Sequence, residues 1–158
     1  MRRVVVMGVG NILRQDEGVG VHALRLLAES GWMSGVDLVD GGTSVFDALS
    51  GWRQIDKLVV LDAVRAGREP GAIARMSLRE VADRTGPALS VHEHGLLDAL
   101  ALLRQAGMRV GEIVIYGVEP GQTGWGTDLS QPVLESLPRL ALQLERELGV
   151  PSTEEKPI

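Results

Sequence analysis

The 158-residue sequence contains no cysteine. Without a thiol, the chain cannot form a disulfide, use a thiolate nucleophile or fold around a zinc ribbon. Basic residues cluster at most in pairs, and the formal net charge is −5, which argues against a nucleic-acid-binding surface. The chain is therefore not a cysteine protease, and we expect no nucleic-acid partner.

Long apolar segments are absent as well, because no run reaches the roughly 20 residues that a membrane-spanning helix needs. The basic start, residues 1–3, leads only into the short apolar run 4–6, without the cleavage pattern of a signal peptide. We therefore expect a soluble, cytoplasmic chain with no membrane partner.

The length of 158 residues and the 44% share of hydrophobic residues suit one domain with a substantial core. We predict a single domain over residues 1–149. The remaining residues, 150–158, are rich in Glu and Pro and are expected to form a flexible tail. We expect the protein to be a monomer.

Apolar runs without polar alternation, at residues 3–8 and 57–62, predict strands buried on both faces of a parallel sheet. Residues 36–40 and 113–118 are typical of two further strands, and residues 41–43 of a turn after the first of them. Four helices are predicted. The first ends before Gly31, the second runs from Ser44 to about Trp52, and the third includes residues 96–103. The fourth extends from about 130 to 148, with a kink or break at Pro138.

The strand expected at residues 73–78 differs from the others because only residues 63–72 connect it to the preceding strand. A parallel crossover needs about a dozen residues or more, usually with a helix, so this strand should run antiparallel at an edge. The predicted fold is a three-layer α/β/α sandwich. Its twisted, mostly parallel sheet has about five strands, one antiparallel edge strand, and helices on both faces.

Acidic residues follow several of the predicted strands, at the sheet edge where α/β proteins bind ligands. Glu17 follows the first strand, Asp40 ends the second, Asp62 ends the third and Glu119 follows the last. His92 precedes a helix that leads into a parallel strand, so this helix must begin at the same edge. Glu17, Asp62 and His92 are therefore predicted to converge.

Two carboxylates and one imidazole suit a borderline divalent ion such as nickel or zinc better than calcium. Three protein ligands leave coordination positions for water or substrate, and such a metal can polarise a peptide carbonyl or activate water. Structural roles remain open, because Asp40 and Asp62 could cap turns and His92 could cap its own helix. His22 is expected to be a surface or packing residue.

Other catalytic motifs fit poorly. The His92-Glu93-His94 sequence lacks the second histidine, four residues after the first, that a zincin requires. A dinucleotide site would need glycine where Leu13 stands, and the acids that follow would repel a pyrophosphate. Ser44 lacks the flanking glycine of a nucleophile elbow.

The order and spacing of these residues resemble those of the endopeptidases that mature nickel-iron hydrogenases. The resemblance spans residues 1 to about 149, and its first block is the most specific part. The matching segments are Gly8-Val9-Gly10-Asn11-Ile12-Leu13, Asp16-Glu17-Gly18-Val19-Gly20, Asp40-Gly41-Gly42-Thr43, Asp62-Ala63, Val91-His92-Glu93-His94-Gly95-Leu96 and Gly117-Val118-Glu119-Pro120.

This resemblance implies a hydrolase that removes a short C-terminal extension from a hydrogenase large-subunit precursor after nickel has been inserted. It implies that Glu17, Asp62 and His92 are the metal-contacting and catalytic residues. Asn11 and the loop of residues 40–43, which comprises Asp40, Gly41, Gly42 and Thr43, would bind substrate. His94 departs from the family, which more often has an aliphatic residue there.

Two mechanisms are compatible with this resemblance. Either the three residues hold a catalytic metal, or they recognise nickel supplied by the precursor; the second version explains why cleavage follows nickel insertion. Zinc or cadmium could replace nickel in a crystal. The alternatives are a metal-delivery or assembly chaperone for the same subunit, without enzymatic activity, and a small-molecule α/β hydrolase or nucleotide-binding protein.

Overall fold

The computed structural model describes residues 2–31, 34–83 and 91–149, and all of their side chains except those of residues 91–94. The predicted tail at residues 150–158 lies outside this part of the chain. No helix among the described residues is long and apolar enough to cross a membrane.

A five-stranded sheet with the order β2-β1-β3-β5-β4 forms the centre of the fold. Four strands are parallel, and β4 pairs antiparallel with β5 at one edge, as its short connection predicts. The strands are β1 (Val4–Val9), β2 (Val36–Gly42), β3 (Gln54–Ala63), β4 (Ile73–Ser77) and β5 (Arg109–Val118).

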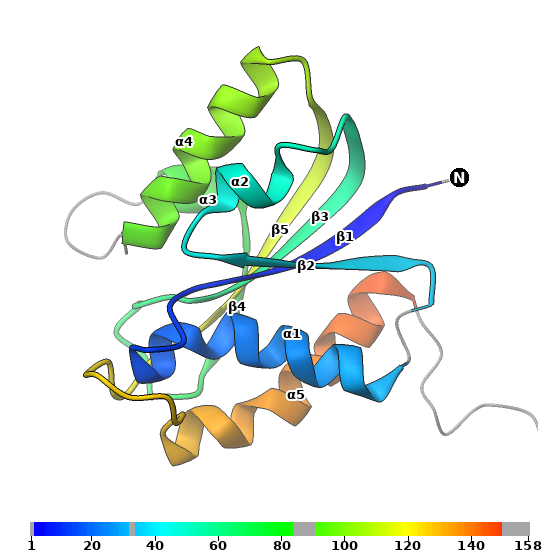
Figure 1. The fold of residues 1–158 in the computed structure, drawn as a ribbon. Helices are drawn as coiled ribbons and strands as arrows, with labels where there is room; N and C mark the ends of the chain where they lie inside the picture. Colours follow the sequence, from blue (N-terminus) through cyan, green and yellow to red (C-terminus); the bar gives the residue numbers. More distant parts are fainter. Residues whose placement is uncertain (1, 32–33, 84–90, 150–158) are drawn as a thin grey trace, which may run out of the picture.

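Helices cover both faces of this sheet, which confirms the three-layer prediction (Figure 1). Successive β1 residues point to opposite sides, so Val5 and Met7 belong to one core and Val6 to the other. One layer contains α1 (Val19–Ser30) and α5 (Gln131–Leu148); the other contains α2 (Val45–Leu49), α3 (Leu78–Ala82) and α4 (Val91–Gln105).

Three local predictions need correction. The strand predicted at residues 36–40 is longer in the structure, because β2 continues to Gly42, where a register shift lets Val9 pair with Gly42. The turn that follows lies at Thr43, where the N–H of Ser44 donates to Gly41 O at 3.0 Å. A break at Pro138 is also wrong. Pro138 has no N–H to donate to the carbonyl oxygen of Leu134, one turn earlier in α5. Both residues are exposed, so water can bond to this carbonyl and the helix continues. The short helix α3, which starts with a capping box at Ser77 and Glu80, was not predicted.

A partly buried ion-pair network fastens the end of α5 to the sheet. Lys57 Nζ lies 2.9 Å from Glu147 Oε2, and the Tyr116 hydroxyl donates to Glu147 Oε1 over 2.9 Å. Hydrogen bonds from Arg75, and then from Lys57 and Tyr116, outweigh burial and lower the pKa of Glu147 to about 2. Burial and the bond to Glu147 raise the pKa of Tyr116 to about 12. Strands β3, β4 and β5 thus share one anchor for α5.

Helix α1 packs on the sheet through direct backbone contact at Gly20. A Cβ atom at this position would lie 2.0 Å from the carbonyl oxygen of Leu61 and 2.6 Å from that of Val9. A Cβ atom at Gly8 would in turn meet the carbonyl oxygen of Gly20 at 2.4 Å. Only glycine allows α1 to start this close to β1 and β3, and the functional edge of the sheet depends on that closeness.

Gly20→Ala should therefore lower the free energy of unfolding by about 3 kcal/mol, or prevent folding, because rigid backbone must move to admit the methyl group. Urea unfolding followed by circular dichroism measures this change. The matched control is Gly95→Ala in α4, where a Cβ atom meets nothing within 4 Å and alanine should stabilise the helix by about 1 kcal/mol. Equal stability of Gly20→Ala and the wild type would contradict the packing argument.

Candidate functional site

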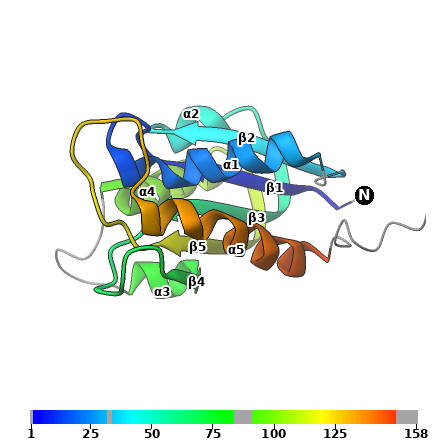
Figure 2. The ribbon, with the colours of Figure 1, turned by 90° about the horizontal axis from the view of Figure 1, so that it is seen from below.

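The carboxyl ends of the parallel strands β1, β3 and β5 meet at one edge of the sheet, and α1, α4 and α5 begin there. Figure 2 shows these helices starting on the same side of the molecule. Ligands of open α/β proteins bind at such an edge. The predicted site residues can be located relative to it.

Asp62 is the penultimate residue of β3, at the predicted edge. It is only 4% exposed, and its Oδ1 accepts a hydrogen bond from the backbone N–H of Ala63 at 2.8 Å. Its neighbour across the strand pair is Gly117, which carries no side chain. A buried carboxylate therefore stands at the end of the central strand.

Glu17 lies in a short 3₁₀ helix, η1 (Gln15–Gly18), between β1 and α1. This helix contacts β3, so the half-buried Glu17 belongs to the same edge as Asp62. The approach is close: a Cβ atom at Gly10, which has φ +137°, would lie 1.9 Å from the carbonyl oxygen of Glu17. Gly10 thus permits η1 to fold back against the end of β1.

His92 is the second residue of α4, whose start lies at the predicted edge (Figures 1 and 2). The side chains of His92 and His94 lie outside the described part of the structure. Among the side chains that the structure describes, no three acids or histidines are grouped closely enough to hold a metal. The convergence of Glu17, Asp62 and His92 therefore stays a prediction at the level of side chains.

Glu119 has a structural role. It is buried, and its Oε2 accepts the backbone N–H of Ala66 at 2.7 Å. Its own backbone exchanges hydrogen bonds with Gly71 and Ala72. Glu119 therefore holds the connection between β3 and β4 in place.

The fully buried Asp16, next to Glu17, is the residue whose importance the sequence analysis missed. Its Oδ2 accepts hydrogen bonds from the backbone N–H groups of Gly121 and Gln122, at 2.8 and 2.7 Å, and from the Ser130 hydroxyl at 2.7 Å. Its Oδ1 accepts the Ser130 N–H at 2.8 Å. One carboxylate thus joins η1 to the loop 121–130, which leads into α5.

These four hydrogen bonds also determine how Asp16 titrates. Burial alone would raise the pKa of its carboxyl, but the bonds from Gln122, Ser130 and Gly121 together outweigh burial and lower the pKa below its usual value. Asp16 is consequently ionised at neutral pH, and both of its carboxylate oxygens can accept hydrogen bonds from Gly121, Gln122 and Ser130. The sequence signal that could have revealed it is an acid followed by two glycines in a loop, which alone is weak.

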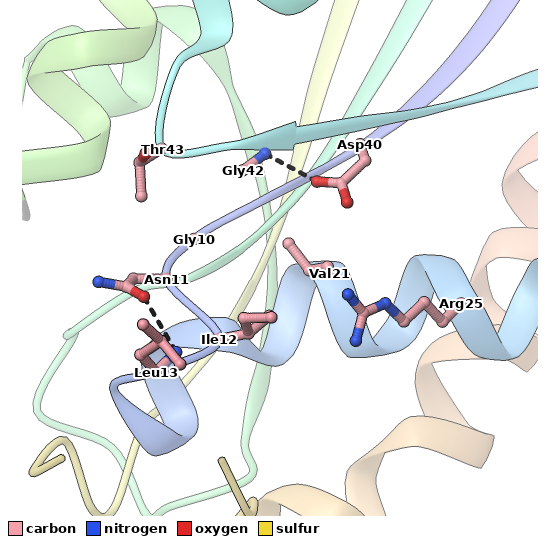
Figure 3. Close-up of a pocket in the computed structure, with 9 residues that line it drawn as sticks. All are labelled: Gly10, Asn11, Ile12, Leu13, Val21, Arg25, Asp40, Gly42 and Thr43. Carbon is pink, nitrogen blue, oxygen red and sulfur yellow. Dashed lines mark hydrogen bonds between the residues drawn. The ribbon is translucent and has the colours of Figure 1, made fainter. Parts of the chain in front are cut away.

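A pocket of about 290 Å³ lies between the first loop, the end of β2 and α1 (Figure 3). Four of the five predicted substrate-binding residues line it, and Gly41 does not. Gly41 instead faces the core, because a Cβ atom at Gly41 would lie 3.0 Å from the Met7 sulfur. The lining comprises Gly10, Asn11, Ile12, Leu13, Val21, Arg25, Asp40, Gly42 and Thr43.

Polar side chains of the pocket stabilise the loops that form it. Asn11 Oδ1 accepts the N–H of Leu13, and Asp40 Oδ1 accepts the N–H of Gly42, both at 2.9 Å (Figure 3). Arg25 reaches the pocket from α1 and, as Figure 3 shows, points its guanidinium toward Val21. The pocket therefore combines an apolar wall with one acidic and one basic side chain.

Comparison with known proteins decides the family. A family model described as hydrogenase maturation protease matches residues 21–147. This chain belongs to the hydrogenase maturation protease family. It is 37% identical over 153 residues to the hydrogenase expression/formation protein HoxM of Azotobacter vinelandii, covering 93% of this chain and 74% of that protein.

Solved structures of the same family share the fold. The hydrogenase maturating endopeptidase HybD from Escherichia coli superposes with a TM-score of 0.75 at 26% identity, covering 97% of this chain and 99% of that one. HybD from Thermococcus kodakarensis also gives 0.75 at 26% identity, covering 92% and 98%. As a member of the hydrogenase maturation proteases, the chain is a hydrolase, as the sequence resemblance implies.

His22 behaves as the expected packing residue in this maturation protease. Its Nε2 is buried without a hydrogen-bond partner in the described structure. Burial, followed by the nearby charge of Arg25, lowers the pKa of its imidazole, although Asp128 acts in the opposite direction. The neutral form is therefore favoured.

Asp16→Asn should lower the free energy of unfolding at pH 7 by about 2 kcal/mol, because an amide cannot accept the same four hydrogen bonds. The folded pKa lies below the ordinary 3.8, so the stabilisation by Asp16 is present above that value and is lost as pH falls through the folded pKa. The stability difference between variant and wild type should therefore shrink under acid conditions. Urea unfolding at several pH values measures it.

The control for this experiment is Asp37→Asn, because Asp37 is exposed on β2. Its stability should equal that of the wild type within about 0.5 kcal/mol. An Asp16→Asn variant as stable as this control at pH 7 would show that the carboxylate does not hold the loop.

Proposed function

We propose that this chain is an endopeptidase that removes the C-terminal extension of a nickel-iron hydrogenase large-subunit precursor after nickel insertion. In this proposal, Glu17, Asp62 and His92 recognise the nickel that the precursor carries. The observation that carries it is the placement of Asp62 at the end of β3, beside the η1 helix that holds Glu17. Membership of the maturation protease family supplies the reaction class.

The donor set fits the proposed ion. Carboxylate and imidazole ligands suit nickel, and three protein ligands leave positions for the groups that the precursor itself provides. Asp62 is buried and its Oδ1 is oriented by the N–H of Ala63, whereas Glu17 is half-buried and can meet an incoming partner. The edge therefore offers one rigid and one accessible carboxylate to a metal arriving with its protein.

The neighbouring pocket is proposed to bind the peptide segment next to the nickel site. Ile12, Leu13 and Val21 supply apolar contacts, while Arg25 and Asp40 can pair with charged or polar groups of a peptide. The nickel would bring the precursor into register, and the pocket would hold the chain to be cut. A precursor without nickel would lack the first of these contacts.

Nickel dependence is the first test of this proposal. We expect the purified protein to shorten nickel-loaded precursor by the mass of its extension, and to leave nickel-free precursor uncut, when both are followed by mass spectrometry. Equal cleavage of the two forms would rule out nickel recognition. Stable complex formation without loss of mass would instead favour an assembly chaperone.

The proposed ligands are the second test. Glu17→Gln and Asp62→Asn remove a charge with little change of shape, and His92→Gln removes the imidazole. Each should slow processing of nickel-loaded precursor by at least about 100-fold, in line with the loss of a direct contact to the reacting assembly. The matched control is Glu29→Gln on exposed α1 surface, which should process at the wild-type rate.

Circular dichroism must show that these variants remain folded. If the Glu17→Gln and Asp62→Asn variants process precursor at the wild-type rate, neither carboxylate belongs to the nickel-recognising site. Activity lost only in His92→Gln would restrict the recognition to the first turn of α4.

A further inference from the structure

Trp125 is the most conspicuous surface residue, because 76% of it is exposed on the loop 121–130. Leu13, on the loop after β1, is also 53% exposed. The two loops are joined beside these side chains. The N–H of Gly126 donates to Leu13 O, and the N–H of Gln15 donates to Gly126 O, both at 2.9 Å. The backbones that carry these two exposed apolar side chains are thus held side by side.

Arg14 holds the indole in place. Its guanidinium carbon lies 4.7 Å from the centroid of the Trp125 ring, and its Nε donates to the carbonyl oxygen of Thr123 at 3.0 Å. No described residue accepts a hydrogen bond from its two Nη groups. We call Leu13, Arg14 and Trp125 the Trp125 platform.

The loops beneath this platform are rigid. Asp16 binds the loop 121–130 through four hydrogen bonds, and the Gln15 side chain accepts the N–H of Gly124 at 3.1 Å. Gln15 itself has φ +50°, a left-handed conformation that costs free energy for a residue other than glycine. The surrounding bonds maintain this strained backbone, so the platform is preorganised.

A preorganised Trp and Arg pair is typical of protein-binding hot spots, where ordering a flexible loop would otherwise weaken association. The apolar ring and Leu13 suit an apolar side chain of a partner. The Nη groups of Arg14 suit a carboxylate beside it. The platform thus selects an apolar residue next to an acidic one.

Leu13 also determines which partner docks here, because it lines the 290 Å³ pocket as well as belonging to the platform (Figure 3). A segment that occupies the pocket contacts Leu13, whose backbone is bonded to the loop that carries Trp125, so the same protein can reach Trp125. A second copy of this chain seated on the platform would instead cover the rim of the pocket and obstruct the substrate.

We infer that the Trp125 platform is a docking surface for the body of the hydrogenase large-subunit precursor, separate from the nickel-recognising residues. The inference rests on the proposed function. Docking by the platform would add affinity for the folded precursor without taking part in bond cleavage. Its loss should therefore raise KM and the Kd of the complex and leave kcat unchanged.

Trp125→Ala tests this inference with nickel-loaded precursor as the probe. We expect Kd and KM to rise at least about 10-fold, as for a hot-spot tryptophan, with kcat within about twofold of the wild type. Trp125→Phe should recover part of the affinity. The matched control is Leu102→Ala, because Leu102 is 55% exposed on α4 and lies outside the pocket lining and the platform.

A fluorescence measurement gives a second readout that a purely structural role would not change. In the Trp32→Phe, Trp52→Phe double variant, Trp125 is the single remaining tryptophan. Its emission should shift to shorter wavelength, and its quenching by acrylamide should fall, when precursor is added. Unchanged quenching in a complex shown to form would overturn the inference.

The possible results distinguish failure of the proposed function from failure of the docking surface. If the wild type does not process the precursor, the proposed function fails. If the wild type processes it and Trp125→Ala has the same KM and Kd, only the docking surface is wrong. If sedimentation shows a wild-type dimer that Trp125→Ala converts to a monomer, the platform is a contact between copies and the inference is overturned.

Discussion

The buried carboxylate of Asp16 is the interaction on which the functional edge depends. Its four hydrogen bonds join two loops that are more than a hundred residues apart in the chain. Because every donor points at one ionised group, neither loop can move without exposing unpaired N–H groups or an unpaired charge. Together with the bonds that join Arg14 and Gln15 to the loop 121–130, this anchor fixes η1, which holds Glu17, against the loop that displays Trp125.

Adjacent acids on η1 have opposite environments. Asp16 points inward and is saturated by donors, whereas Glu17 is half-buried and remains open to a partner. Both are carboxylates, so residue type alone could not tell them apart. Glycines at positions 8, 10 and 20 complete the arrangement, because each lets backbone approach where a methyl group would collide.

Much of the architecture could be predicted from local patterns. Unbroken apolar runs indicated the buried parallel strands, and the short connection at residues 63–72 required β4 to run antiparallel. The predictions that failed depended on what surrounds each segment in the folded chain. β2 extends through Gly42 because Val9 supplies a partner for it, and α5 passes Pro138 because solvent can satisfy the freed carbonyl.

The sequence by itself determined the layer order of the fold and the edge at which Glu17, Asp62 and the start of α4 lie, because strand direction follows from the order and length of the connections. Through the family resemblance, it also predicted that Asn11, Asp40 and Thr43 bind substrate. Only the tertiary structure decided that they line a common pocket, that Asp16 is an anchor, and that Trp125 stands beside Leu13. These features arise from pairing between loops distant in sequence, whose geometry no local pattern encodes.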